Sequence, residues 1–209
     1  MKNSDIFIGS FGIFILILIL LAIINNFDAH QSKKLLEIKN QLENQQKSLD
    51  ILNENMQILQ NQNNVILNYY KKFTMVFNTL QNENPYNTID ELLEITNAIV
   101  VWSQCKSINH KLLIALILIE SMANHNAISS VGAIGVMQLM PFHLKHYIKE
   151  PTIDEHIMEG SIYLKYLINN YGEVGGLKRY LCGESNKKCI NSKEASKYYW
   201  KIKNKQIKI

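Results

Sequence analysis

The chain has 209 residues, 47% of them hydrophobic, and its formal net charge is +4. This length suffices for one domain of about 120 residues with extensions, and the hydrophobic fraction suffices for a packed core. The modest charge, and the lack of the aromatic and glycine patterns of nucleic-acid modules, argue against a nucleic-acid-binding protein.

Residues 6–24 form an apolar run without a charge, broken only by Gly9, Ser10 and Gly12. As a helix this run spans roughly 28 Å, about the hydrocarbon thickness of a bilayer. A cleaved signal peptide is the alternative, but the run exceeds the usual signal-peptide core and no small-x-small cleavage site follows it. We therefore predict a single uncleaved anchor over residues 1–29, with a transmembrane helix at about 6–24.

A heptad stripe follows the anchor, with spacings that alternate between three and four residues and twelve apolar residues at fourteen positions. Its members are Leu35, Ile38, Leu42, Gln45, Leu49, Leu52, Met56, Leu59, Asn63, Ile66, Tyr70, Phe73, Phe77 and Leu80. This 3.5-residue period predicts a coiled-coil stalk over residues 30–83, and Asn63 at an a position favours a parallel dimer. A single helix packed on the following domain is the alternative.

Pro85 interrupts the stripe, and residues 84–88 form the predicted linker to a domain over residues 89–209. Capping boxes at Thr88–Glu91 and Thr152–Glu155 each start a helix. We expect helices at about 89–104, 109–122, 137–147, 152–171, 174–181 and 192–203, with a loop at 129–136. No alternating strand pattern is present, so the predicted fold class is all-α.

Glu120 directly follows eight apolar residues, Leu112 to Ile119. Eight residues are too few to cross a bilayer, so this run predicts a helix buried in a soluble core. Apolar surroundings penalise the charged form of a carboxyl group and raise its pKa. A carboxylic acid that keeps its proton near neutral pH is what cleavage of a glycosidic bond requires.

The residues after Glu120 follow the pattern E-S-x-x-N-x-x-A-x-S-x-x-G-A-x-G-V-M-Q-x-M-P, which ends at Pro141. This pattern resembles the lytic transglycosylase domain of the soluble type, in the lysozyme-like superfamily, with Val136 in place of Leu as the single change. The family's G-x-x-Y-L element appears at Gly160, preceded by His156 where members usually carry Asn. Its Y-N-A-G element appears as Tyr180-Leu181-Cys182-Gly183.

The resemblance implies a lysozyme-like domain that cleaves peptidoglycan, with no cofactor and no metal. Glu120 is the implied catalytic residue, acting as acid and then as base to form 1,6-anhydro-MurNAc ends. The implied substrate-binding residues are Ser129, Gln138, Met140 and Tyr180. A goose-type muramidase is one alternative, and a catalytically silent wall-binding or scaffold protein is another.

The remaining cysteines and histidines give weaker signals. Cys182 and Cys189 lie seven residues apart and are a possible disulfide, which leaves Cys105 as a buried thiol. His125, His143 and His146 lack the carboxylate that would complete a metal site. From Lys187 onward, eight lysines face one acid, Glu194, which suits carboxylate-bearing wall peptides, anionic lipid or a solvated helix face.

The lysines beside the anchor mildly oppose an exported C-terminal part, because Lys2 lies before it and Lys33, Lys34 and Lys39 after it. A wall-cleaving enzyme has no substrate in the cytoplasm, however. We therefore predict a single-pass inner-membrane protein with its catalytic domain in the periplasm. Its expected partners are peptidoglycan strands, the membrane and a second copy of the chain.

Overall fold

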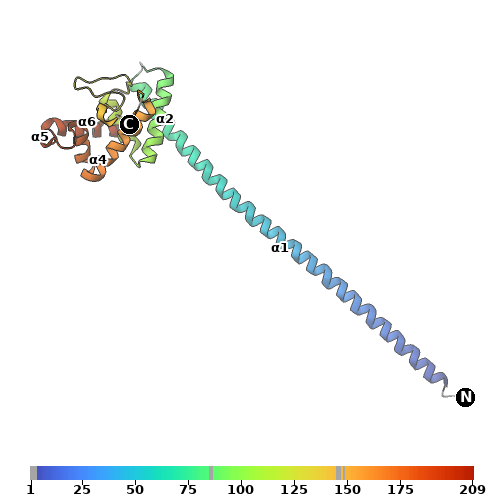
Figure 1. Ribbon diagram of the computed structural model, residues 1–209. Coiled ribbons are helices and arrows are strands. Elements are labelled where there is room, and N and C mark those ends of the chain that lie inside the picture. The colour runs from blue at the N-terminus through green and yellow to red at the C-terminus, as the bar shows by residue number, and fades with distance from the viewer. Residues whose placement is uncertain (1–3, 85–86, 145–146, 148) are drawn as a thin grey trace. The chain divides into compact units, whose positions relative to one another are not determined.

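The computed structural model describes residues 4–84, 87–144, 147 and 149–209, with residues 4–14 described by their backbone alone. Within these ranges helices are the regular elements, joined by loops that carry two isolated β-bridges (Figure 1). They are α1 (Ser4–Glu83), α2 (Ile89–Cys105), α3 (His110–Glu120), α4 (Ile153–Cys182), α5 (Lys187–Ile190), α6 (Lys193–Lys208) and a 3-10 turn at Pro141–His143. The prediction of an all-α fold is confirmed.

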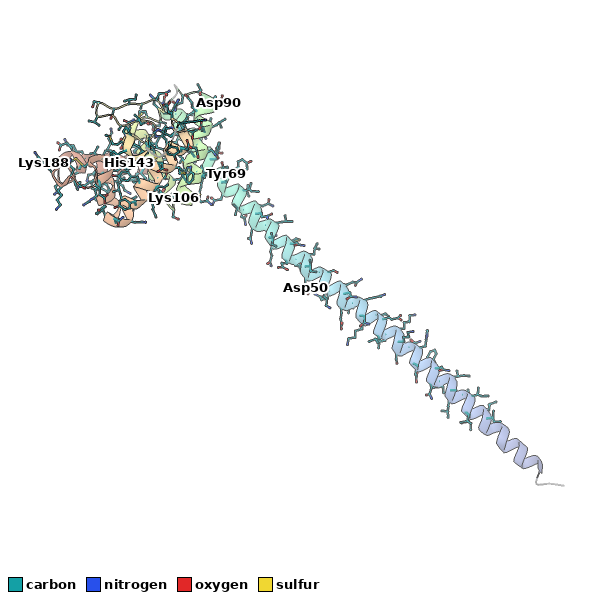
Figure 2. The ribbon with its side chains drawn as sticks, viewed as in Figure 1. Asp50, Tyr69, Asp90, Lys106, His143 and Lys188 are labelled. Atoms are coloured by element: carbon teal, nitrogen blue, oxygen red, sulfur yellow. A yellow bond between two sulfur atoms is a disulfide. The ribbon has the colours of Figure 1, made fainter. Side chains whose placement is uncertain are left out.

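Residues 1–64 form the first of two compact units, whose described part, residues 4–64, is the N-terminal part of α1. This helix is long and apolar enough, by length and composition, to cross a membrane. The heptad residues Leu35, Leu42 and Leu49 are exposed in the single chain, and Figure 2 shows side chains around Asp50 standing out from the helix. The first unit therefore carries apolar surface that the single chain does not cover.

The last turns of α1 belong to the second unit, residues 65–209. Val76 and Leu80 are fully buried there, and the Tyr69 hydroxyl donates a 2.6 Å hydrogen bond to Asn97 Oδ1 on α2. Lys205 Nζ on α6 lies 2.6 Å from Glu83 Oε2. The alternative of a packed single helix therefore describes the end of the heptad stripe, whereas its earlier positions stay exposed.

The predicted helix starts are confirmed by their caps. Thr88 accepts a hydrogen bond from the Glu91 amide while the Glu91 carboxylate accepts one from the Thr88 amide, and Thr152 and Glu155 repeat this arrangement. Each capping box satisfies amide donors that the first helical turn leaves without a partner. Leu112 to Leu118 of α3 are buried, so the apolar run is the core helix that its length predicted.

One predicted helix was wrong, and one predicted helix end was right. A helix over 137–147 is absent from the part of that range that the structure describes, where the 3-10 turn at Pro141–His143 is the helical segment. Gln138 has a φ of 50° and Leu139 bridges to Ile134, so the backbone folds back before it reaches Pro141. The predicted end of a helix at Gly172 is confirmed, because Gly172 has a non-helical φ of 68° and α4 consists of two helices that meet at a kink there.

Candidate active site

Glu120 is the last residue of α3, and its side chain is half-buried. Burial raises the pKa of Glu120 to about 7, although a hydrogen bond from Tyr198 and the charge of Lys201 act in the opposite direction. Desolvation is therefore the dominant effect. A carboxyl group with this pKa exchanges its proton near neutral pH, as a group that acts first as an acid and then as a base must.

Two tyrosines from the C-terminal helices approach the carboxyl group. Tyr198 of α6 donates a hydrogen bond to Glu120 Oε1, and Tyr180 of α4 donates a 2.9 Å hydrogen bond to the Met137 carbonyl. Burial and the nearby Glu120 charge raise the pKa of both phenols well above the usual value, so both remain hydrogen-bond donors. The sequence resemblance pointed to Tyr180 but missed Tyr198, which lies outside its motifs.

The chain after Glu120 makes a tight turn that two asparagines of the segment between α1 and α2 hold in place. Met122 and Ala123 have φ values of 56° and 61°, a left-handed conformation that is costly for residues other than glycine. Asn84 Nδ2 donates to the Met122 carbonyl at 2.7 Å, and Asn87 Nδ2 donates to the Ala123 carbonyl at 3.0 Å. These bonds help to fix the backbone immediately beyond the carboxyl group.

Ser129 and Gln138 anchor the loop that forms one wall of the site. The Ser129 hydroxyl accepts a 2.9 Å hydrogen bond from the Ala133 amide. Gln138 Nε2 donates to the carbonyls of Ala127 and Gly135 at 3.1 and 3.0 Å. Both side chains therefore shape the loop, in addition to facing the space where a ligand would bind.

One cleft of about 480 Å³ brings together all five residues that the sequence singled out for catalysis and substrate binding. They are Glu120, Ser129, Gln138, Met140 and Tyr180. Within the described part of the chain, Glu120 is the one acidic residue in the lining. The cleft thus offers a single carboxyl group for proton transfer and no second carboxylate to act as nucleophile or base.

A row of aromatic rings, which no sequence motif indicated, runs from Tyr180 to Phe142 along the lining of the cleft. Ring centroids lie 5.5 Å apart between Tyr180 and Tyr163, 4.3 Å between Tyr163 and His143, and 4.2 Å between His143 and Phe142. Burial lowers the pKa of His143, which favours its neutral form. Phe142 is 61% exposed, so the row ends in an apolar face open to a ligand.

A disulfide and a free thiol account for the three cysteines. Cys182 and Cys189 are joined by a disulfide that links the end of α4 to α5, and Cys182 lines the cleft. Cys105 is exposed, so its prediction as a buried thiol was wrong; it ends α2 at the surface. Among the described residues no group of three or more His, Cys, Asp or Glu side chains could hold a metal, and His146 lies outside them.

Comparison with known proteins identifies the family of this sequence. The sequence model for the family described as "Transglycosylase SLT domain" matches residues 97–203. The chain belongs to this family. The matched range contains Glu120, the cleft residues and Tyr198, whereas all of α1 lies before it.

Two solved structures similar to this SLT chain are both lytic transglycosylases. One is an inactive mutant of Slt from Pseudomonas aeruginosa, with 19% identity, 53% of this chain and 23% of that chain covered, and a TM-score of 0.45. The other is the 70 kDa soluble lytic transglycosylase from Escherichia coli, with 16% identity, coverages of 66% and 29%, and a TM-score of 0.46. The chain thus spans less than a third of either protein, and no curated protein matches it.

Proposed function

We propose that this SLT-family chain is a membrane-anchored lytic transglycosylase, which cleaves the β-1,4 bond between MurNAc and GlcNAc in peptidoglycan. The observation that carries the proposal is Glu120, a single carboxyl group in the cleft whose pKa burial raises to about 7. A glycosidase with two carboxylates can use the second as nucleophile or base, whereas a cleft with one suits a reaction in which the substrate supplies the nucleophile.

The chemistry follows from this one group. Protonated Glu120 gives its proton to the oxygen between muramic C1 and the GlcNAc ring, and that C1–O bond breaks. The Glu120 carboxylate then takes the proton of the muramic C6 hydroxyl, whose oxygen bonds to C1 and closes a 1,6-anhydro ring. The Tyr198 hydroxyl donates a hydrogen bond to Oε1 of Glu120, which leaves Oε2 to carry the proton in both steps.

Replacing Tyr198 with Phe is expected to move the alkaline limb of the pH–rate profile to higher pH. The Tyr198 hydrogen bond lowers the pKa of Glu120, so its removal raises that pKa further and keeps the acid protonated to higher pH. The rate of muropeptide release, measured from pH 5 to pH 9, tests this. Tyr199→Phe, which removes the neighbouring phenol, should leave the limb in place; an unshifted limb in Tyr198→Phe would contradict the assignment.

The reaction products distinguish the proposal from its alternatives. Mass spectrometry of digested peptidoglycan should show 1,6-anhydro ends, each lighter by one water than the reducing ends that a goose-type muramidase would release. Reducing ends in the products would show that the protein is a hydrolase and not a lyase. No products at all from the wild-type protein would favour a silent wall-binding or scaffold protein.

The N-terminal unit supports the anchoring part of the proposal. Residues 1–29 would anchor the chain in the membrane, and residues 30–83 would form a stalk. Residues 84–88 would link this stalk to the periplasmic catalytic domain, residues 89–209. An apolar helix long enough to span a bilayer and the Cys182–Cys189 disulfide agree with an exported domain. A phosphatase fused after Ile209 should therefore be active, and its inactivity beside an active cytoplasmic reporter would refute this topology.

The exposed heptad stripe supports a dimer through the stalk. Leu52, Met56 and Leu59 are all more than half exposed in the single chain, and a second helix would cover them. The full-length protein in detergent should therefore sediment as a dimer, and a monomer at high micromolar concentration would refute the coiled coil.

A further inference from the structure

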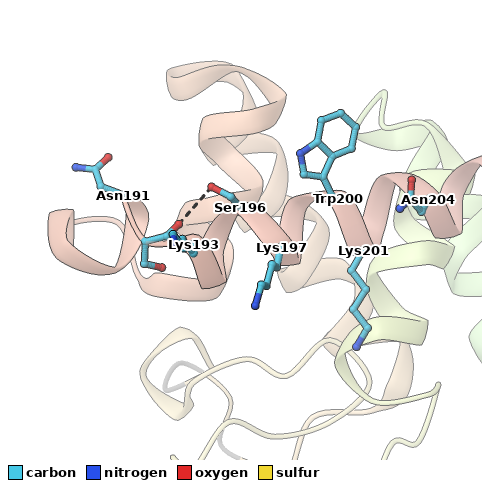
Figure 3. Close-up of a pocket in the computed structure, with 8 residues that line it drawn as sticks. Asn191, Lys193, Ser196, Lys197, Trp200, Lys201 and Asn204 are labelled. Atoms are coloured by element: carbon cyan, nitrogen blue, oxygen red, sulfur yellow. Dashed lines mark hydrogen bonds between the residues drawn. The ribbon is translucent and has the colours of Figure 1, made fainter.

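The outer face of α6 carries a shallow groove, separate from the cleft, with a volume of about 580 Å³. Figure 3 looks onto this face, where Lys197 and Lys201 point one way across the helix and Trp200 the other. The lining residues are Asn191, Ser192, Lys193, Ser196, Lys197, Trp200, Lys201 and Asn204. The groove therefore combines cationic groups, small polar groups and one large ring.

The lysines of this groove differ from other lysines of the same helix. Lys193, Lys197 and Lys201 recur every four residues and so share one face. Lys203 and Lys205 instead form ion pairs with Glu173 and Glu83, at 2.8 and 2.6 Å. No ion pair within 4 Å joins the three groove lysines to a described carboxylate, and Lys197 acts on Glu194 only at longer range. Their positive charge remains available to an anionic ligand.

Trp200 contributes exposed apolar surface beside these charges. Its side chain is 59% exposed, and its ring contacts Tyr199 edge to face with centroids 5.1 Å apart. An exposed Trp next to cations and to hydrogen-bonding groups is typical of a binding surface. Ser196 and Asn204 supply polar groups along the same face.

The groove borders the catalytic residue. Lys201 lines it and is also close enough to Glu120 to lower the pKa of that carboxyl group. Tyr198, on the adjacent face of α6, donates a hydrogen bond directly to Glu120. A glycan held with its scissile bond at Glu120 would therefore bring the groups attached to its sugars to this helix.

We infer that the α6 groove binds the carboxylate-bearing peptide stem of peptidoglycan, with the lysines pairing its carboxylates and Trp200 covering its apolar side chains. This inference rests on the proposed function, because it extends the same glycan beyond the cleft. A peptide suits the groove better than an anionic lipid surface does. Helices that lie in a bilayer present a broad apolar face, whereas here Trp200 is the one apolar residue among seven polar ones.

Binding is tested with the full-length protein in detergent and the disaccharide–tetrapeptide GlcNAc–MurNAc–peptide, which lacks the bond that the enzyme would cleave. Trp200 fluorescence should report its binding, and Trp200→Phe should abolish the signal. Lys193→Gln/Lys197→Gln should weaken binding roughly three- to tenfold at low salt, the loss expected for two exposed ion pairs. Lys187→Gln/Lys188→Gln makes the same charge change outside the groove and should have no effect.

Three outcomes would overturn the inference. The first is equal affinity for the disaccharide with and without its peptide, and the second is equal weakening by the two double variants. The third is a Trp200 response to bilayers containing phosphatidylglycerol together with no response to the muropeptide, which would assign the groove to lipid. Peptide-dependent binding by a wild-type protein that cleaves no glycan would refute the proposed function. It would still support the inference that the α6 groove binds the peptide.

Discussion

Glu120→Gln is expected to abolish peptidoglycan cleavage while the domain stays folded. Gln has nearly the shape of Glu but cannot give a proton to the leaving oxygen, so at least the contribution of general acid catalysis is lost, about 10²- to 10⁴-fold. Release of soluble muropeptides from purified sacculi measures this. Glu94→Gln, the same change on the exposed surface of α2, should retain full activity.

The same substitution is expected to stabilise the protein in alkaline buffer. Between about pH 4.5 and pH 7 the unfolded state loses the Glu120 proton while the folded state keeps it, so stability falls with rising pH by about 3 kcal/mol in total. Gln carries no charge and avoids this loss. Chemical unfolding should therefore show the variant more stable than wild type at pH 8 and a smaller difference at pH 5.

Two results would contradict this reading of Glu120. Near wild-type cleavage by Glu120→Gln would show that Glu120 is not the catalytic acid. Loss of cleavage with a stability difference that does not change between pH 5 and pH 8 would mean that the carboxyl group is not held in the environment that raises its pKa.

The parts of the site that sequence predicted are those encoded by adjacent residues. The apolar run before Glu120 determines both the burial of α3 and the raised pKa of its last residue. Ser129 and Gln138 belong to one uninterrupted motif, and the short loop that contains them reaches the cleft as a unit. Local sequence and local structure agree there, so the prediction needed no knowledge of distant contacts.

The parts that sequence missed depend on distant segments. Tyr198 reaches Glu120 across a separation of 78 residues, and only the packing of α6 against α3 shows which of its tyrosines points inward. Phe142 and His143 fall where a helix was expected, so their rings were not assigned to one side of the cleft. The heptad stripe likewise gives no sign that Leu80, its last member, is buried in the core of the second unit.

Gly135→Ala is expected to be the most damaging small substitution in the loop. Gly135 has a φ of 74°, and an added Cβ would lie 2.5–2.8 Å from three ring atoms of His156, which is buried. Backbone strain and overpacking each cost about 1–3 kcal/mol, so we expect a loss of about 2–6 kcal/mol in unfolding free energy. Activity should fall as well, because the Gly135 carbonyl accepts the hydrogen bond that positions Gln138.

Gly132→Ala provides the matched control, since Gly132 has a φ of 88° but nothing within 4 Å of the added Cβ. It should lose only the backbone contribution, about 1–3 kcal/mol. His156→Ala removes the ring that the new methyl group would meet, so it should recover part of the stability lost in Gly135→Ala and none of that lost in Gly132→Ala. Unfolding midpoints of the two double variants measure this difference. Equal recovery in both would mean that His156, which stands where SLT sequences usually carry Asn, does not set the space around Gly135.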